Sequence, residues 1–520
     1  ISLLPSPTKA VGKVVDERIT GGILKRLWSD PPTLDPHLTS DTTSAGIVVE
    51  IFGGLVAFDM DTSLSLIPDL AATWEISSDS LTYTFIIRDN ATFHDGKRVT
   101  AQDFKWSLER ASAPETGSPT ADTYLGDIVG VKDVLEGKTT VITGVKVIDD
   151  KTLQIKIDSP KAYFLAKLTY PTSYVVDKEN VVSGGRSWTD KPNGTGPFRL
   201  AEYKIGEIIV LERNERYHLE SAKLSKVRMN LAGGSSMAMY ENDEIDITGV
   251  GLFDLERIKD PAEPLNKDLV IAEPDYSIRY IGFNTGEPPF DDPKFRQALN
   301  HAVNKDLIAK EVFSSLVVPA YGILPPGLPG YNSKLEGLRY DPVLANKLLS
   351  ESRYADPNTR PRMVITIPGT GGTADLDLEV IVNMWKETLG VEFEIQQVEW
   401  ATYLQDLDRR KFQSFGGLGW EADYPDPQDF LDVLFHSESE NNHGGYRNDQ
   451  VDQLLEIARA EPDNSKRMSI YNDVERLIVD DAAWLPLWFA GERHILIKPH
   501  IKGYRITPMT MPKLRHVYIE

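Results

Sequence analysis

Short strand-like and helix-like segments alternate along most of this chain, and this alternation limits its fold more than any other feature. Residues 81–88 (LTYTFIIR) alternate polar with apolar, β-branched and aromatic side chains, which predicts a strand. Residues 100–110 (TAQDFKWSLER) predict a helix, with Thr100 as its N-cap and Asp103 placed close to a capping box. The pattern indicates the α/β class, with crossover connections between strands.

The block of residues 290–484 is richer in helix than the part before it, where short strands and hairpins dominate. Extended segments at 278–283 and 485–497 bracket this block, as two crossover strands between two lobes would. An ordinary fluctuation in secondary structure explains the same pattern, so the two-lobe interpretation needs further support. The other expected elements are hairpins within 145–157 and 198–212, strands at 364–367, 391–395 and 412–417, and helices at 292–310, 376–389, 400–411 and 428–435.

Composition excludes several classes of function. The 520 residues suggest about three domains or lobes, and a hydrophobic fraction of 41% is ample for real cores. With 56 basic and 78 acidic residues the net charge is −22, which argues against binding nucleic acid or anionic lipid. The chain contains no cysteine, so disulfides, thiolate metal sites and cysteine nucleophiles are excluded.

No apolar run approaches the roughly 20 residues that a membrane-spanning helix needs. Residues 1–21 are rich in Ser, Pro, Lys and Gly, and we expect a tether before a first strand near Ile23. That tether is either a frayed terminus or a stalk that followed a secretion or lipid-anchor signal.

A search for catalytic motifs finds almost nothing. The nine histidines form no HExxH zinc motif, no GxSxG nucleophile elbow is present, and Lys132 stands where a P-loop before Lys138 would need glycine. His436 and His443 lack a third ligand at a recognisable spacing. We therefore predict no catalytic residue, no cofactor and no metal site.

One loop, residues 415–427 (FGGLGWEADYPDP), contains a carboxylate that local structure does not explain. Asp426, Pro427 and Asp429 suit the start of the helix expected at 428–435. Asp423 has no such role.

Asp423 stands between Trp420 and Tyr424, and a carboxylate beside two aromatic rings is suited to holding a cationic group. The alternative is an Asx-turn carboxylate or a surface ion pair.

Several motifs in a fixed order resemble those of a known family. From about Gly22 to Pro486 the chain is similar to the family 5 extracellular solute-binding proteins of bacterial ABC importers, which bind dipeptides, oligopeptides or nickel. The matching segments are Leu34-Asp35-Pro36, residues 67–104 with IPDLA, WE, FHDG and TAQD, residues 194–217 (GTGP to RNERY), 280–302 (PPFDD to RQAL), 340–349 (YDPVLANKLL) and 419–427 (GWEADYPDP).

The resemblance implies a type II periplasmic-binding fold, in which two lobes close around a ligand by a hinge. It also implies an extra domain inserted in the first lobe, export to the periplasm or cell surface with a possible lipid anchor, and an ABC transporter permease as partner; we expect a monomer. The expected divisions are a tether at 1–21, lobe I at 22–58 and 190–277, the inserted domain at 59–189, lobe II at 278–490, and a C-terminal return to lobe I at 491–520.

In the family, the Asp of the GWxxDY motif binds the α-ammonium of bound peptides, and that position here is Asp423. An extended edge that meets the peptide backbone would lie near residues 28–33, where Asp30 matches a common acidic position. The expected ligand-binding residues are Asp423, Trp420, Tyr424, Asp30, Trp28, Trp400, Tyr403 and Gly417.

The chain departs from the dipeptide binders in one loop. Those proteins hold the ligand carboxylate with an Arg after the strand at 364–367, whereas residues 368–377 (PGTGGTADLD) contain no Arg or Lys. We therefore expect capture of peptides longer than dipeptides.

An oligosaccharide or opine ligand is an alternative, because sugars stack on Trp. Trp74, Trp106, Trp385, Trp484 and Trp488 follow apolar periodicities typical of a core, which leaves Trp28, Trp188, Trp400 and Trp420 for a cleft. A glycosidase is a remote alternative, since Glu421 and Asp423 stand two positions apart on one segment and are not expected to face each other across a cleft.

Overall fold

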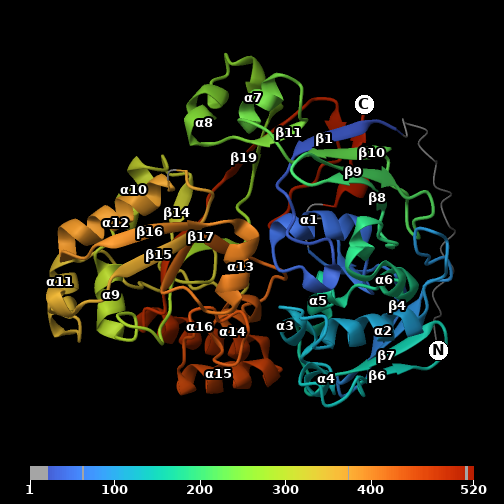
Figure 1. Cartoon of the computed structure of the whole chain (residues 1–520), viewed down its shortest axis with the longest axis horizontal. Helices are drawn as coiled ribbons and strands as arrows, with labels where there is room; N and C mark the ends of the chain where they lie inside the picture. Colours follow the sequence, from blue (N-terminus) through green and yellow to red (C-terminus); the bar gives the residue numbers. More distant parts are fainter. Residues whose placement is uncertain (1–20, 61–63, 373, 510–512) are drawn as a thin grey trace, which may run out of the picture.

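Two lobes, each built around β-sheets, make up the molecule (Figure 1). The computed structural model describes residues 21–60, 64–372, 374–509 and 513–520. The tether expected at 1–21 lies outside these residues except for Gly21. Strands and helices alternate along the described chain, which confirms the α/β class.

The first lobe contains a four-stranded sheet in which β1 runs parallel to β10 and the other neighbours are antiparallel. Its strands in spatial order are β1 (Ile23–Leu27), β10 (Lys226–Asn230), β9 (Ile208–Arg213) and β8 (Phe198–Lys204). Helix α1 (Thr42–Ile51) packs on this sheet through Ile47, Val48 and Ile51. The β8–β9 pair is the hairpin predicted at 198–212.

A second sheet of four strands, all antiparallel, belongs to a part of the chain with five helices, of which α3 (Ala121–Leu125) contacts the other lobe. Its strands are β4 (Ala71–Ile76), β5 (Thr82–Ile87), β7 (Thr152–Lys156) and β6 (Val145–Val147), with α2 (Ala101–Ser112), α3 (Ala121–Leu125), α4 (Val131–Leu135), α5 (Phe164–Lys167) and α6 (Lys178–Gly184). The predicted capping box of α2 is present, because Thr100 and Asp103 each accept the other's backbone N–H.

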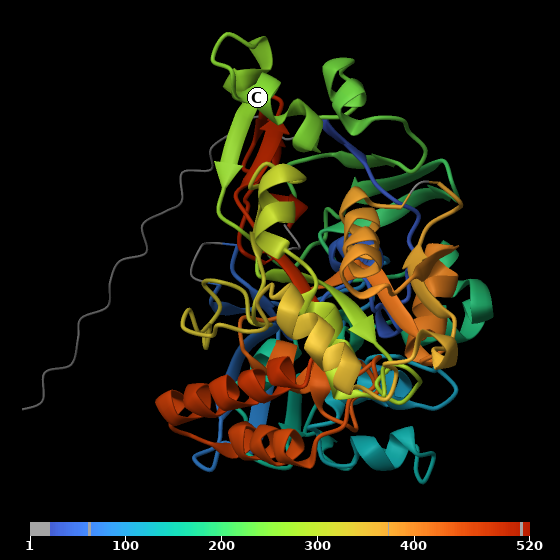
Figure 2. The ribbon, with the colours of Figure 1, turned by 90° about the vertical axis from the view of Figure 1, so that its left-hand side faces the viewer.

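A three-stranded sheet connects this part of the chain to the other lobe. Its strands are β11 (Ile247–Gly249), β19 (Arg493–Ile497) and β12 (Leu269–Ala272), flanked by α7 (Ser236–Glu241) and α8 (Leu252–Lys259). Figure 2 shows the red β19 beside light-green strands at the top of the molecule. Two short pairs complete the lobe: β2 (Val56–Phe58) with β3 (Leu66–Pro68), and β20 (Ile501–Lys502) with β21 (Tyr518–Ile519).

The second lobe is a six-stranded mixed sheet covered by helices on both faces. The strand order is β14 (Val317–Pro319), β18 (Trp484–Ala490), β13 (Ser277–Phe283), β17 (Ser414–Glu421), β15 (Met363–Pro368) and β16 (Phe393–Val398). The helices are α9 (Pro293–His301), α10 (Lys305–Glu311), α11 (Pro342–Glu351), α12 (Leu376–Leu389), α13 (Trp400–Asp408), α14 (Gln428–Phe435), α15 (Asp449–Ala460) and α16 (Asn464–Asp480). Residues on opposite faces of β13 belong to different cores, Ile278 and Tyr280 to one and Ile281 and Phe283 to the other.

Two extended passages join the sheets of the lobes. The chain passes from β12 of the three-stranded sheet to β13 of the six-stranded sheet. It returns from β18 of the six-stranded sheet to β19 of the three-stranded sheet. The extended run expected at 485–497 is divided between β18 and β19 around Gly491. The domain boundaries derived from the sequence stay predictions.

Two expectations were wrong in detail. The single helix expected over 292–310 is two helices, because Asn304 accepts the N–H of Leu307 and starts α10 anew after α9 ends. Trp188, expected in a cleft, is only 5% exposed and packs edge-on against Phe52, with ring centroids 5.9 Å apart. Among the residues described, no helix is long and apolar enough to cross a membrane.

A buried ion pair joins α2 to the segment before α1. Arg110 donates from both terminal nitrogens to Asp35, at 3.0 and 2.5 Å, and also contacts Nδ1 of His37 at 2.8 Å. Burial opposes ionisation of Asp35, but the hydrogen bonds and charge of Arg110 outweigh it and lower the pKa of Asp35. We expect Arg110→Leu to reduce the free energy of unfolding by about 3–5 kcal/mol, because it leaves a buried carboxylate uncompensated.

Urea denaturation would measure this effect. The matched control is Arg98→Leu, which removes an exposed arginine near the same helix and should change stability by no more than about 0.5 kcal/mol. Equal stability of the two variants would contradict the structural role of the Asp35–Arg110 pair.

Candidate ligand-binding site between the lobes

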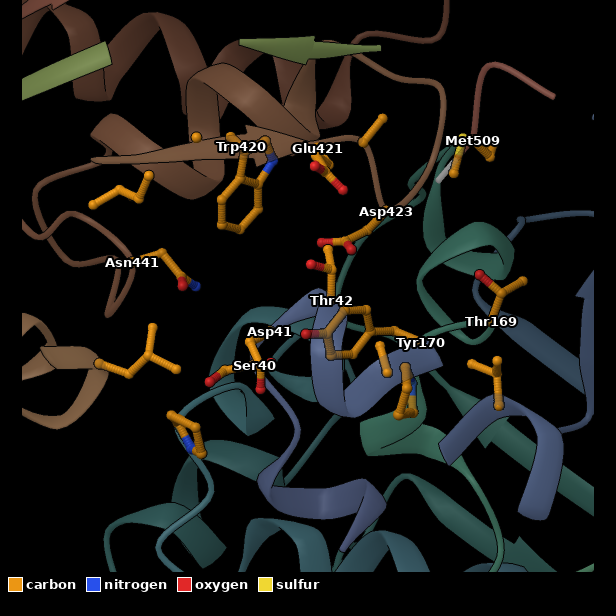
Figure 3. A pocket seen from close by; sticks show the side chains of 18 of the residues that line it. Ser40, Asp41, Thr42, Thr169, Tyr170, Trp420, Glu421, Asp423, Asn441 and Met509 are labelled. Atoms are coloured by element: carbon orange, nitrogen blue, oxygen red, sulfur yellow. The ribbon is translucent and has the colours of Figure 1, made fainter. Parts of the chain in front are cut away.

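A cavity of about 260 Å³ lies between the lobes. Figure 3 shows Trp420, Glu421 and Asp423 entering it from one lobe, while Ser40, Asp41, Thr42 and Tyr170 come from the other. Its lining segments fall within residues 40–64, 119 and 169–174 on the first side, 279–280, 400–423, 441 and 443 on the second, and 507–513. A ligand held here touches both lobes.

Asp423 is placed by the end of a strand and the start of a helix. It follows β17, and Ala422 before it donates to the carbonyl of Tyr276 at 2.8 Å. The backbone N–H of Asp423 donates to Oδ2 of Asp429, in the first turn of α14, at 3.0 Å. This N–H contact and the strand fix the direction of the Asp423 side chain toward the cavity.

Four acidic residues lie between positions 423 and 432, and they divide into two pairs. Asp426 accepts two hydrogen bonds from Arg467 at 2.9 and 2.5 Å, and Asp432 accepts two from Arg459, both at 2.6 Å. Asp423 and Asp429 form no ion pair with any described basic residue. Of the two carboxylates that lack a cation, Asp423 lines the cavity and Asp429 lies directly behind it.

The surroundings of Asp423 and Asp429 favour the protonated form of both carboxyl groups. Burial, with a smaller contribution from the negative charge of Glu421, raises the pKa of Asp423 to about 7. The hydrogen bond from the hydroxyl of Tyr124 acts in the opposite direction but is a smaller effect than burial. Burial and the charge of Asp423 raise the pKa of Asp429 well above its ordinary value. Two adjacent buried carboxyl groups cannot both ionise without a compensating cation, so the site is suited to receive one.

The lobes touch each other at one side of the cavity. Tyr124 of α3 reaches Asp423 with its hydroxyl, and Asn441 donates to Oγ1 of Thr123 at 2.9 Å. The ring of Tyr163 lies 6.4 Å from that of Tyr424. Figure 1 shows α3 beside α14 at this contact.

Four of the predicted residues line the cavity: Asp423, Trp420, Trp400 and Gly417. The indole N–H of Trp420 lies 3.4 Å from Oδ2 of Asp429, which also holds Asp423. Gly417 has a φ of +69°, and a Cβ there would lie 2.9 Å from Cδ of Pro368, so the strand needs glycine at this point.

Two predicted tyrosines lie behind the cavity wall and do not line it. Tyr403 is fully buried, donates to the carbonyl of Gly416 at 3.0 Å, and supports Trp400 with a stacked ring 6.0 Å away. Tyr424 is fully buried and donates to the side chain of Gln428.

Trp28 and Asp30 are also outside the lining, because contacts within the first lobe use their polar atoms. The indole N–H of Trp28 donates to the carbonyl of Thr43 at 3.0 Å. Asp30 accepts from the hydroxyl of Tyr203 at 3.1 Å and from the N–H of Gly206 at 2.5 Å.

Several lining residues escaped sequence reasoning. Asp41 lines the cavity, but its sequence position indicates only an N-cap, and its side chain does cap α1 by accepting the backbone N–H of Ser44. Tyr170 also lines the cavity, and Tyr124 stacks on it with ring centroids 3.6 Å apart; neither has a local sequence signal. Their positions depend on contacts far away in the sequence, because Tyr170 donates to the carbonyl of Thr39 at 3.2 Å and Tyr124 donates to Asp423 of the other lobe.

The basic side chains in the lining have partners of their own. Arg279 contacts Glu421 at 3.3 Å, His443 lies 3.3 Å from Asp408, and Lys513 lies 3.4 Å from the carbonyl of Val49. Among the described residues no group of three His, Asp or Glu could hold a metal ion.

The raised pKa of Asp423 makes the stability of the empty protein depend on pH. The carboxyl binds its proton more tightly in the folded chain, at about pH 7, than in the unfolded chain, where the pKa is 3.8. Stability therefore falls as pH rises from about 4 to about 7, and the loss persists above pH 7. We expect Asp423→Asn to unfold at a higher temperature than the wild type at pH 8, with the difference vanishing below pH 4.

Calorimetry of ligand-free protein would test this expectation. The matched control is Asp426→Asn, which breaks the ion pair with Arg467 and should lower the unfolding temperature at pH 8. A wild type more stable than Asp423→Asn at pH 8 would refute the unfavourable burial of Asp423.

Comparison with known proteins identifies the family. Residues 65–442 match the family model described as "Bacterial extracellular solute-binding proteins, family 5 Middle". The chain is 30% identical over 518 residues to the periplasmic oligopeptide-binding protein OppA of Escherichia coli, a match that covers 96% of this chain and 92% of OppA.

Solved structures agree in fold over almost the whole chain. The oligopeptide-binding protein OppAIV of Borrelia burgdorferi gives a TM-score of 0.87 at 29% identity, covering 96% of this chain and 100% of that one. The Escherichia coli murein tripeptide-binding protein MppA gives 0.86 at 27% identity, covering 96% and 99%. The unliganded open form of MppA gives only 0.67 at the same identity, covering 96% and 98%, in agreement with the lobe contacts seen here. The chain therefore belongs to the family 5 bacterial extracellular solute-binding proteins and has their two-lobe type II fold.

Proposed function

We propose that this protein captures short peptides with a free amino end, as the periplasmic or cell-surface binding component of an ABC importer that delivers them to a membrane permease. One observation carries the proposal: Asp423 faces the cavity between the lobes and has no basic partner among the residues that the structure describes. The α-ammonium of a peptide would supply the missing cation.

The backbone of β17 suits a peptide placed beside it. β15 pairs with β17 only at Ser414 and Phe415, so the later part of β17 has no strand on that side. Residues 417–421 of this strand line the cavity. A peptide could add there as a strand, with backbone hydrogen bonds that are indifferent to its sequence.

The relatives support a peptide ligand. Their names include oligopeptide-binding and dipeptide-binding proteins, and the DppA protein of Helicobacter pylori, 25% identical with a TM-score of 0.84, was solved in complex with the peptide STSA. Residues 368–377 contain no cation to clamp a dipeptide carboxylate, which favours longer peptides.

The alternatives have less support. Asp429 accepts the backbone N–H of Asp423 from behind the cavity wall, so these two acids do not face each other across the cavity as the carboxyl groups of a glycosidase flank a glycosidic bond. The family consists of binding proteins, and no contact in the site favours an oligosaccharide or opine over a peptide.

Removal of the Asp423 carboxylate should weaken binding of peptides through their amino end. We expect Asp423→Ala to lose about 2–4 kcal/mol of binding free energy for a tetrapeptide with a free amine, because the buried ammonium is left without a charged acceptor. Isothermal titration calorimetry would measure the difference.

The N-acetylated form of the same peptide is the control, and wild type and variant should bind it equally weakly. Equal binding of the free-amine peptide by wild type and Asp423→Ala would sink the proposal.

The affinity for a free-amine peptide should also depend on pH. Only the ionised form of Asp423 pairs with an ammonium, and the pKa of this group in the empty protein is raised to about 7. Below pH 7 the ligand must displace a proton, so we expect the dissociation constant to rise about tenfold for each pH unit. Titrations at pH 5, 6 and 7 check this slope, and Asp423→Asn should show no such slope over the same range.

A further inference from the structure

Asp429 is a buried acid that the proposed contact with a peptide does not use. It is 0% exposed, and it does not line the cavity. Its Oδ2 accepts the backbone N–H of Asp423 at 3.0 Å and lies 3.4 Å from the indole N–H of Trp420. One carboxyl oxygen therefore contacts two residues of the cavity wall, while Oδ1 is buried with no hydrogen-bond partner.

We propose that Asp429 is a positioning residue that orients Asp423 and Trp420 toward the ligand, and that it does so as an uncharged carboxylic acid at neutral pH. This inference rests on the proposed function only in identifying what the two oriented side chains bind. The geometry of the three residues stands without it.

The charged and titratable groups around Asp429 favour the uncharged form. Asp423 and Asp426 add negative charge from the adjoining loop, and Tyr124 of α3 and Tyr424 also face the pair. The nearby basic side chains are already engaged, Arg467 by Asp426 and Arg459 by Asp432.

One effect opposes this conclusion, and it is the weaker one. Asp429 stands in the first turn of α14, where the helix dipole favours a negative charge. That effect is small beside the penalty for burying an uncompensated carboxylate next to a second one. Burial and the charge of Asp423 accordingly raise the pKa of Asp429 far above its ordinary range.

An uncharged Asp429 gives the site a single negative charge. A peptide ammonium then neutralises Asp423 alone, and the backbone of Asp423 stays fixed by a neutral acceptor. A negative charge on Asp429 would instead leave one carboxylate buried and unpaired after the ligand had bound. The carbonyl oxygen of an asparagine could accept the same two N–H groups, so asparagine should replace Asp429 in this role.

Infrared spectroscopy of ligand-free protein tests the protonation state directly. We expect the spectrum of wild type at pH 8 to contain a carbonyl band of a protonated carboxylic acid that is lost in Asp429→Asn. The matched control is Asp432→Asn, which replaces another buried acid of the same helix but one paired with Arg459, and it should remove no such band. Absence of the band from the wild-type-minus-Asp429→Asn difference spectrum would overturn the proposal.

Binding tests the positioning role. For a free-amine tetrapeptide at pH 8 we expect Asp429→Asn to change the dissociation constant by less than about threefold, and Asp429→Ala to raise it roughly tenfold or more, as for a lost hydrogen bond to a buried group. The fluorescence of Trp420, followed in a Trp420→Phe difference, should shift in Asp429→Ala and not in Asp429→Asn. Equal effects of the two substitutions would refute the role. Failure of Asp423→Ala to weaken peptide binding would refute the proposed function, while the infrared result would still decide the state of Asp429.

Discussion

The site depends on two adjacent carboxyl groups, Asp423 and Asp429, that the fold buries without a cation. The same short segment contains two other acids, Asp426 and Asp432, each held by an arginine in two hydrogen bonds. Arginine side chains therefore neutralise two of the four acids in this segment, and Asp423 and Asp429 are the two without an arginine partner among the described residues. Because an unpaired buried carboxylate is unfavourable, Asp429 keeps its proton, and Asp423 is left as the carboxyl group that a cation can neutralise. In the proposed function, the missing positive charge beside Asp423 is therefore what selects the ligand.

In the proposed function, closure of the lobes around a ligand depends on the same missing positive charge. In the closed arrangement the hydroxyl of Tyr124 is the donor that the first lobe offers to Asp423. A ligand ammonium carries three donors and a full charge, so its interaction with the closed site exceeds what the hydroxyl alone provides. A ligand that touches both lobes only when they meet shifts the equilibrium toward the closed form. The contacts between Asn441 and Thr123 and between Tyr424 and Tyr163 add to the closed form whether or not a ligand is bound.

Sequence reasoning succeeded where the signal was local. The capping box of α2, the β8–β9 hairpin and the start of α14 depend on residues within a few positions of one another. Asp423 was singled out because local structure left it without a role, and it lines the cavity. The family motifs predicted the two-lobe fold, which the comparisons confirm.

Contacts made across the fold escaped that reasoning. Tyr124 lies 299 positions before Asp423, and nothing near it in the sequence marks it. Trp28 and Asp30 have residue types suited to a ligand, but their hydrogen-bonding atoms are used by Thr43, Tyr203 and Gly206. Nothing near Asn304 in the sequence marks it as the point that divides the helix expected over 292–310. The division follows from its side chain, which accepts the backbone N–H of Leu307.

Asp429 shows why residue type and spacing can mislead even when they are interpreted correctly. An acid in the first turn of a helix fits the helix dipole, and that explanation needs no other contact. In the folded protein the same side chain accepts the backbone N–H of Asp423 and approaches the indole of Trp420. Both statements hold for Asp429, but burial beside a second carboxyl group raises its pKa more than the helix dipole lowers it, which favours the uncharged acid. The net charge of −22 contributes little to this result, because charges on the exposed surface are screened by salt while the pair at the cavity is not.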